Sequence, residues 1–579
     1  MAQHLSIRVP WKDNGYNGLV CDKPCYNNAC LRLSNIAENK NDKREAELAG
    51  SPIVGHEKEI PCVSEGGVFM ATVCHKKMVD HPYKSTGNNT HKHFLETELK
   101  YPPFTLPARP FGWTMLRKGN EGKYDNINRL SEMYNIDFKA GREPNLGFDT
   151  NWVQDATNQR AIFERFYENI TPRNSLVIPY AKQVPFIEDS KRVIIGIGFV
   201  DSIEPPPEYN HTGTESLRSI LWETMVGHSI RKERKDGFLL PYSEMMKYAE
   251  EHPDFDMRSV TVFAEDEYYN EFSYATEHLT HDAVISVLLQ TIKVLEVIKK
   301  CIQGNWDECI AWTKARLKEV QKDRGAFPGA GVALYAMGFK QGFIIADEVK
   351  KSLSENESFV GNLEHAIAEP QKVLSLNIVS SIGKTEQNAF IKLSSERKSL
   401  FWLLARFSLT LEQMQVLLNG GYKYYNYRGQ EQYKEIDIGC SASCILKNPY
   451  LIYENTRLLE PEFQIPFRSV DMAVFPPDEL RTIDPLPEPS FIPASNDERR
   501  IRALVIGILE RQLLNGHTVY PQSRLVADIN EMPLDPSCTV SGDILNSLNH
   551  FFENDIISVE MKNGKTAHKL DRIQCFGAK

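Results

Sequence analysis

Four cysteines near the start of the chain have the residue type and clustering expected of metal ligands. Three residues separate Cys21 from Cys25, and four separate Cys25 from Cys30. Cys62 can complete a set of four thiolates, which would hold zinc in a tetrahedral site or an iron–sulfur cluster. The spacing matches no standard zinc finger or ferredoxin pattern, so independent thiols remain the alternative. We expect zinc or an iron–sulfur cluster at these four residues.

Histidine and aspartate in the middle of the chain suggest a second kind of chemistry. The segment EHLTHD contains His278, His281 and Asp282, an order similar to that of the HD phosphohydrolases, and His228 is a candidate further ligand. Such residues can hold a divalent cation that activates water for attack on a phosphodiester. The structural alternative is that Asp282 complements the dipole in the first turn of a helix, while His281 caps or packs. A metal-dependent nuclease or phosphohydrolase therefore remains an open alternative.

Two further features could contact DNA phosphates. The segment HSIRKERKDG carries a run of basic side chains, which could also be a solvated loop: Arg231, Lys232, Arg234 and Lys235. In GAFPGAGVALYAMGF, Gly329 and Gly331 have the pattern of a helix-hairpin-helix. There, a glycine turn offers backbone N–H groups at a helix N-terminus to a phosphate, because no side chain blocks the approach. The alternative is a plain turn between two core helices.

No ATPase motif accompanies these candidates. The strings Gly383-Lys384-Thr385 and Gly564-Lys565-Thr566 are each preceded by an apolar residue where a P-loop requires its first glycine. Those apolar residues are Ile378 and Val559. The sequence therefore predicts no ATP-driven motor in this chain.

Composition limits the class of protein. The chain has 579 residues, 41% hydrophobic and 25% charged, with a net charge of −10. An acidic balance argues against a surface that binds DNA all over, although it permits a local basic patch. No apolar run is long enough to span a membrane, and the first residues do not resemble a signal peptide. We expect a cytoplasmic protein with mostly reduced cysteines and no membrane partner.

The helices and strands expected around these residues indicate an α+β fold with several domains. Gly196 and Gly198 lie within an apolar, β-rich run, which suggests a bulged strand in a small barrel resembling PUA or EVE domains. We expect a Cys/His-rich module over 1–110, the β-rich small barrel over 111–210, a helical domain over 211–325, a helix-hairpin-helix-like helical region over 326–480, a proline-rich linker over 481–498 and a winged helix over 499–579.

The last of these domains has the clearest pattern. Three amphipathic segments follow the proline-rich stretch, and the third begins after Ser541, a favourable N-cap. IISVEMKNGKTAHKL then predicts a hairpin that turns at Asn563-Gly564. Three helices and a hairpin make a winged helix, whose third helix would face a DNA groove. That helix is not very basic, so a protein–protein role is an alternative.

The order of parts in residues 320–579 resembles the non-motor N-terminal half of bacterial RecD-like superfamily 1 helicases. The matching features are FPGAG (Phe327 to Gly331), NPYLIYE (Asn448 to Glu454) and the winged-helix segment GHTVYPQSRLVADI (Gly516 to Ile529). The resemblance implies DNA binding by a helix-hairpin-helix and a winged helix. It departs from the family because the motor domains are absent from this chain.

This resemblance favours a DNA-binding scaffold or recognition subunit of a bacterial anti-phage defence or DNA-processing complex. A RecD-like helicase in trans, or a nuclease subunit encoded nearby, would be its partner. Two alternatives remain: the metal-dependent nuclease or phosphohydrolase described above, and a redox or metal sensor built on Cys21 to Cys62.

Overall fold

The fold combines α-helices with several β-sheets, as the sequence predicts. The computed structural model describes residues 3–84, 91–117, 122–188, 191–213, 217–354, 357–425, 430–552 and 555–573. The chain forms two compact units, unit 1 (Met1–Asp323) and unit 2 (Arg324–Lys579). Within the described residues, no helix has the length and apolar character needed to cross a membrane.

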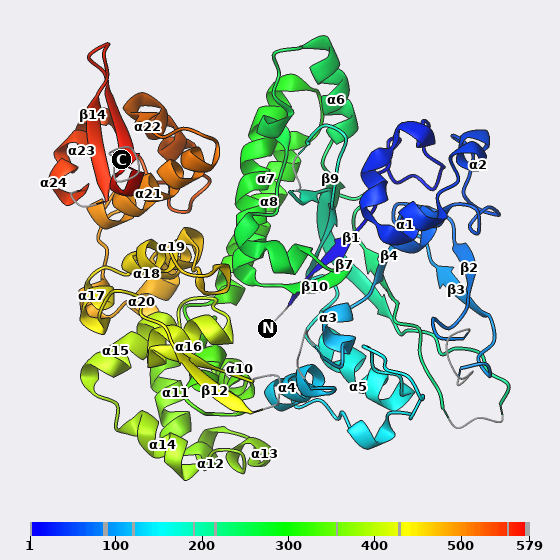
Figure 1. The fold of residues 1–579 in the computed structure, drawn as a ribbon, viewed down its shortest axis with the longest axis horizontal. Coiled ribbons are helices and arrows are strands. Elements are labelled where there is room, and N and C mark those ends of the chain that lie inside the picture. The colour runs from blue at the N-terminus through cyan, green and yellow to red at the C-terminus, as the bar shows by residue number, and fades with distance from the viewer. Residues whose placement is uncertain are drawn as a thin grey trace. The chain divides into compact units, whose positions relative to one another are not determined.

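Unit 1 is built on a mixed sheet (Figure 1). Its strands are β1 (His4–Arg8), β4 (Thr105–Ala108), β5 (Leu176–Ala181), β6 (Val193–Ile194), β7 (Gly196–Glu204), β8 (Thr224–His228), β9 (Gly237–Leu239) and β10 (Thr276–Leu279). The order is β10-β1-β5-β7-β8-β4, with β6 beside β5 and β9 beside β7. Only β1 and β5 pair in parallel among these described strands.

The small closed barrel expected over 111–210 is not found. In the part of the chain that is described, the hydrogen-bonded path has two ends, β10 and β4, and does not close. Its strands come from residues as far apart as His4 and Leu279. Apolar alternation in the sequence identifies strands, but it does not reveal which distant strands they pair with.

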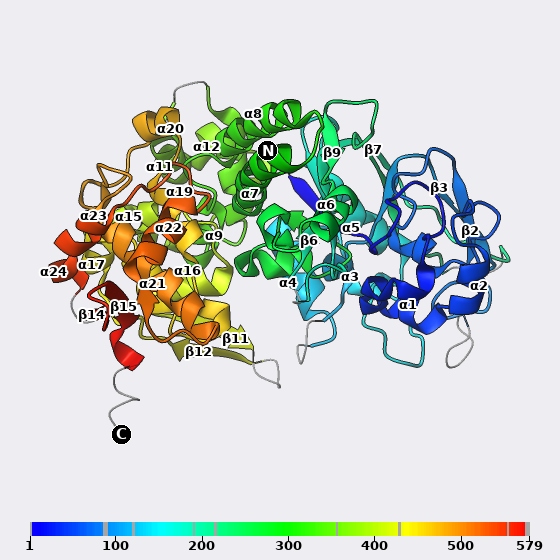
Figure 2. The same cartoon turned by 90° about the horizontal axis from the view of Figure 1, so that it is seen from above.

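Helices and a smaller sheet complete unit 1. The helices are α1 (Ser34–Asn39), α2 (Asp42–Glu47), α3 (Phe111–Thr114), α4 (Asp125–Tyr134), α5 (Ala156–Tyr167), α6 (Tyr242–Glu251), α7 (His281–Cys301) and α8 (Trp306–Arg324). Both views show α7 and α8 running beside each other (Figures 1 and 2). Strands β2 (His75–Val79) and β3 (Thr97–Tyr101) form a separate pair. The N-terminal module packs in an apolar cluster that includes Ile53, Val63 and Leu99 and extends to Tyr209 and Met225, so it does not rely on a metal alone for a core.

Unit 2 is mainly helical. Its helices are α9 (Ala330–Ala336), α10 (Gly342–Ser352), α11 (Phe359–Ala368), α12 (Pro370–Val373), α13 (Leu376–Val379), α14 (Lys384–Ile391), α15 (Ser395–Leu404), α16 (Leu411–Asn419), α17 (Ala442–Lys447), α18 (Leu451–Thr456), α19 (Phe467–Val474), α20 (Asp478–Ile483), α21 (Glu498–Leu514), α22 (Gln522–Glu531), α23 (Gly542–Ser547) and α24 (Asn549–Phe552). Its strands are β11 (Gly421–Tyr425), β12 (Glu431–Glu435), β13 (Tyr520–Pro521), β14 (Ile556–Glu560) and β15 (Thr566–Leu570).

One apolar core runs through unit 2, from Ala326 to Leu570. The proline-rich segment predicted as a linker belongs to this core, because Leu486 and Ile492 are buried in it. The prolines and polar residues suggested a linker, but its two buried apolar side chains pack against the helices of unit 2.

The C-terminal elements follow the sequence closely. The Ser541 hydroxyl accepts a hydrogen bond from the Ile544 N–H and caps α23, as expected. Strands β14 and β15 pair from Ile556↔Leu570 to Glu560↔Thr566, and Gly564 has a φ of 73° in the turn. The predicted third helix is divided into α23 and α24. The three-stranded sheet has the order β13-β15-β14.

Candidate functional site

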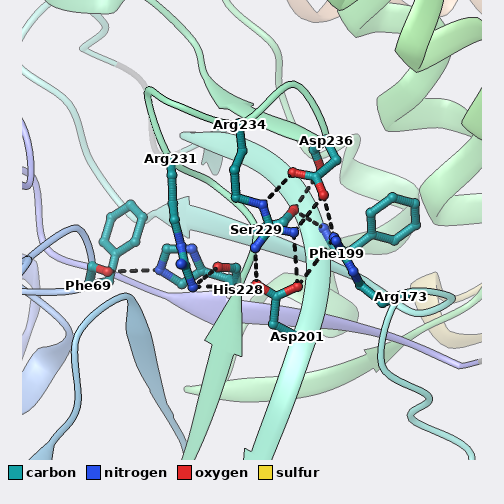
Figure 3. A network of polar contacts seen from close by, with 9 residues as sticks. All are labelled: Phe69, Arg173, Phe199, Asp201, His228, Ser229, Arg231, Arg234 and Asp236. Atoms are coloured by element: carbon teal, nitrogen blue, oxygen red, sulfur yellow. Dashed lines mark hydrogen bonds and ion pairs between the residues drawn. The ribbon is translucent and has the colours of Figure 1, made fainter.

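The basic run of unit 1 lies in a polar network that follows the end of β8 and includes Asp201 from the middle of β7 (Figure 3). Arg234 binds Asp201 at 2.5 Å and Asp236 at 2.5 Å. Arg231 lies 3.4 Å from Asp201, and Arg173 bonds to both carboxylates. Although burial opposes ionisation, Arg234 and Arg173 keep the pKa of Asp236 below its ordinary value. The network therefore joins three guanidinium groups to two carboxylates.

These ion pairs limit the positive charge that the basic run can present to DNA. Lys235 pairs with Glu308 at 2.9 Å, and the Arg231 guanidinium stacks over the ring of Phe104 at 4.3 Å. Lys232 is exposed. Charge pairing of this kind stabilises the loop and reduces its positive potential. DNA contact by the run stays a prediction.

The histidines proposed as metal ligands are held by backbone carbonyls. His228 Nε2 donates to the Phe69 carbonyl oxygen at 2.8 Å, and His278 Nε2 donates to that of Phe166 at 2.9 Å. Burial lowers the pKa of each histidine to about 4, so both rings are neutral near pH 7. His278 also stacks on the Phe166 ring, with centroids 3.9 Å apart. Within the described residues, no group of three or more His, Cys, Asp or Glu side chains is arranged to hold a metal ion.

His281 and Asp282 occupy the first turn of α7. The Thr280 hydroxyl caps this helix by accepting from the Ala283 N–H at 3.2 Å. Asp282 is buried there, and the His281 ring meets that of His4 edge-on at 5.4 Å. This placement agrees with the structural alternative, in which Asp282 complements the helix dipole.

Sequence reasoning missed Glu271, which lies beside this turn. Its carboxyl oxygens accept from the Thr280 N–H at 2.6 Å and from the Thr280 hydroxyl at 3.0 Å. Burial raises the pKa of Glu271 to about 8, and the charge of Asp282 contributes. The carboxyl group therefore keeps its proton near neutral pH. No local signal in the sequence identifies it, because the shift depends on tertiary burial.

The four cysteines do not all converge. Cys21 and Cys30 are buried on either side of Asn27, whose amide donates to Cys21 Sγ at 3.3 Å and whose carbonyl accepts from Cys30 Sγ at 3.1 Å. Cys62 packs against the cluster that contains Cys30. Cys25 is exposed, and its thiol donates to the Asp42 carbonyl at 3.5 Å.

Burial raises the pKa of Cys30 to about 12 and that of Cys62 to about 11. Both side chains are therefore neutral thiols, which are poor nucleophiles. Zinc or a cluster would have to displace these protons and recruit another ligand or move Cys25. Metal binding at the cysteines stays a prediction, and the raised pKa values argue against a redox sensor.

Internal packing explains the two hairpin glycines. The Gly329 N–H donates to the Ala405 carbonyl at 2.9 Å, and a Cβ at this position would overlap the Phe407 carbonyl oxygen. A Cβ at Gly331 would lie 2.8 Å from the Cα of Phe343 in α10. The Gly329 N–H therefore already has a hydrogen-bond partner within the protein. Contact of either glycine with DNA stays a prediction.

A buried polar network links the NPYLIYE segment to the C-terminal helices. Arg500 of α21 makes a two-bonded ion pair with Asp471 of α19, with both N–O distances at 2.7 Å. The Tyr450 hydroxyl, from the Asn-Pro-Tyr sequence, donates to the same carboxylate at 2.6 Å. All three side chains are buried. The side chain of Tyr450 therefore holds the segment before α18 against α19 and α21.

Partly exposed ion pairs reinforce this junction. Arg502 of α21 binds Glu454 of α18 at 3.0 Å and also pairs with Asp555. Arg457, just after α18, binds Glu510 of α21 at 2.9 Å. The segment from Asn448 to Glu454 therefore forms a packing surface for α21, the first helix of the C-terminal group (α21 to β15).

The exposed residues of that C-terminal group are unevenly charged. Helix α23 exposes Asp543, Asn546 and Ser547, which bring no positive charge. The turn between β14 and β15 exposes Lys562 and Lys565. Any phosphate contact in this group would therefore come from the hairpin turn more than from the third helix.

No family model matches the chain, and no solved structure matches it. The chain is similar to the uncharacterized protein MJ1519 of Methanocaldococcus jannaschii, with 21% identity over 589 residues. The similarity covers 97% of this chain and 42% of MJ1519, so the chain spans about two fifths of that relative's length.

Proposed function

We propose that the chain is a DNA-binding recognition scaffold of a DNA-processing or anti-phage defence complex, and that a RecD-like helicase supplied separately does the motor work. The observation that carries the proposal is the element order in residues 498–570. It runs α21, β13, α22, α23 with α24, β14 and β15, and the sheet order is β13-β15-β14. This order supports the assignment of a winged helix.

The position of the Asn-Pro-Tyr segment supports the same proposal. In RecD-like helicases this segment precedes the winged helix. Here Tyr450 binds Asp471 of α19, which pairs with Arg500 of α21, and Glu454 binds Arg502 of α21. The hairpin turn with Lys562 and Lys565 would contact phosphates, and the little-charged face of α23 would contact the partner.

Duplex DNA binding tests the hairpin directly. In the full chain, the double substitution Lys562→Gln and Lys565→Gln should weaken binding of a short duplex by about tenfold and lower the salt slope by about two, since each lysine neutralises about one phosphate. Fluorescence anisotropy over a range of salt concentrations measures both quantities.

A matched control removes the same charge elsewhere in unit 2. Lys384 and Lys392 are exposed, and changing both to Gln should leave binding unchanged. An equal loss in both double variants would mean that net charge alone drives binding, and the hairpin would have no special part.

The helicase half of the proposal needs a separate test. The tagged chain, purified from its native host, should bring down a stoichiometric helicase that mass spectrometry identifies. Recovery of the chain without any helicase or nuclease would contradict the proposal that a separate partner does the motor work. We do not carry the nuclease alternative forward, because His228 and His278 use Nε2 to bind backbone carbonyls and because no group of three or more His, Cys, Asp or Glu side chains in the described residues is arranged to hold a metal ion.

A further inference from the structure

Three polar side chains connect a helix of the C-terminal group to both strands of its hairpin. The Ser558 hydroxyl of β14 donates to Asn549 Oδ1 of α24 at 2.8 Å, and it lies 3.2 Å from His568 Nδ1 of β15. Ser558 and His568 are direct partners in the antiparallel register. Side chains of such cross-strand neighbours lie close enough to interact. We call Asn549, Ser558 and His568 together the polar bridge.

The direction of these hydrogen bonds follows from the number of protons. A serine hydroxyl has one proton to donate, and Asn549 Oδ1 receives it here. The Ser558 oxygen must then accept from His568, which requires the ring to carry its proton on Nδ1. Burial lowers the pKa of His568 to about 4, so the ring is neutral near pH 7 and has one N–H.

The second ring nitrogen agrees with this assignment. His568 is fully buried, and its Nε2 has no hydrogen-bond partner within the described residues. A proton on Nε2 would therefore be a buried donor without an acceptor, which is costly. It would also remove the hydrogen bond between Nδ1 and the Ser558 hydroxyl that the other form makes. The surroundings of the ring thus favour the Nδ1–H form.

The polar bridge links the hairpin to the helices beside it. Strand β14 is the last in the sheet order β13-β15-β14, so its backbone pairs with β15 alone among the described strands. In the described part of the chain, the bond from Ser558 to Asn549 is the one side-chain hydrogen bond between residues 556–570 and a helix. Figure 1 shows that the turn of the hairpin extends beyond α23 and α24.

The distance from the polar bridge to the turn makes the angle of the hairpin important. Lys562 follows Ser558 by four residues, which is about 13 Å of extended strand. A small change in the angle between β14 and α24 at Ser558 would therefore move the turn by a larger distance. Lys562 and Lys565, the exposed lysines of the turn, would move with it.

We propose that the polar bridge positions the hairpin for DNA binding. By fixing the angle between the hairpin and α24, it presents Lys562 and Lys565 together to one phosphate backbone. This inference rests on the proposed function and adds the residues that prepare its site. Without the bridge, the hairpin would become ordered only on binding, and the entropy lost in that step would reduce the affinity. The number of phosphates contacted would stay the same, and so would the salt slope.

Duplex binding by the full chain tests the positioning role. Ser558→Ala should weaken binding about fivefold, the usual effect of one lost hydrogen bond, and leave the salt slope unchanged. Ser558→Thr keeps the hydroxyl and should bind like the wild type. Ser547→Ala is the matched control, because the Ser547 hydroxyl bonds within α23, to the Ile544 carbonyl at 2.7 Å. Its affinity should equal that of the wild type.

A double-mutant cycle tests whether the bridge acts as a unit. Asn549→Ala should cause about the same fivefold loss as Ser558→Ala, because either change breaks the link between β14 and α24. The two changes together should then cost no more than one of them. Losses that multiply, to about twenty-five-fold in the double variant, would mean two independent contacts and would overturn the bridge.

The position of the proton on the His568 ring gives a signature that a general loss of stability would not produce. In the full chain labelled with ¹⁵N-histidine, nuclear magnetic resonance should show a protonated Nδ1 and a bare Nε2. The signal of His568 is identified by its loss in His568→Gln. In Ser558→Ala the Nδ1 proton loses its acceptor, so the ring should shift toward the Nε2–H form, which histidine favours in water. A wild-type ring protonated on Nε2 would overturn the bridge.

The outcomes separate this inference from the proposed function. Wild-type chain that binds no duplex would contradict both. Wild-type chain that binds duplex, with Ser558→Ala binding equally well, would overturn the positioning role and leave the proposed function standing. A lower salt slope in Ser558→Ala would also overturn the positioning role, because the variant would then have lost phosphate contacts and not only the order of the hairpin.

Discussion

At the scale of single residues, burial decides which titratable groups are charged. The rings of His4, His228, His278 and His568 are neutral because burial lowers each pKa to about 4. A histidine with an ordinary pKa of 6.5 in the unfolded chain takes up a proton there first as the pH falls. Folding stability is therefore fully present above about pH 6.5 and is lost as the pH falls toward 4.

His228→Gln tests this origin of acid sensitivity. The variant removes one of the depressed groups, so its unfolding free energy should fall less steeply between pH 6.5 and 4, by up to about 1.4 kcal/mol per pH unit. Urea unfolding at several pH values measures the slope. His252→Gln, at an exposed position of unit 1, should keep the wild-type slope, and equal slopes in all three proteins would contradict the explanation.

Residue patterns with a local cause could be predicted from the sequence. The cap at Ser541 and the turn at Asn563-Gly564 depend only on neighbours in the chain, and the structure confirms both. Asp282 in the first turn of α7 belongs to the same class. The raised pKa of Glu271 and the pairing of Arg234 with Asp201 depend on residues distant in sequence, so no local pattern could indicate them.

At the scale of elements, the buried pair Arg500–Asp471 connects α21 to α19 and reaches Tyr450. Arg500→Met would leave the Asp471 carboxylate buried without its counter-charge, so unfolding should become easier by about 3–5 kcal/mol. Chemical denaturation followed by circular dichroism measures the change. Arg511→Met, at an exposed position of the same helix, should change stability by less than about 0.5 kcal/mol, and a similar small effect at Arg500 would show that the pair is not needed.

Elements were easier to predict than their pairing. Helices α7 and α8 lie in the region predicted to be helical, α21 is the first of the three amphipathic segments predicted after the proline-rich stretch, and β7 contains the predicted run with Gly196 and Gly198. The position of β1 between β5 and β10 was not predictable, because it joins Leu5 to Val177 and to His278 across long stretches of chain. The expected barrel is not found for that reason.

At the scale of the whole molecule, the chain divides into two units at Asp323, and one apolar core runs through unit 2. A fragment that begins near Arg324 should therefore fold alone and unfold in one cooperative transition. Calorimetry of the isolated fragment measures this. A fragment that binds hydrophobic dyes and melts without a clear transition would mean that unit 2 needs unit 1 to fold.

The buried proline-rich segment also limits how this protein could have changed over evolutionary time. Arg406 donates to the carbonyls of Asp484 and Pro485, and Ile492 fills the core beside them. A gene exchange that joined a foreign winged helix after this segment would leave those partners mismatched. We therefore expect an exchange of the C-terminal helices to be tolerated only when the helices before them are exchanged as well.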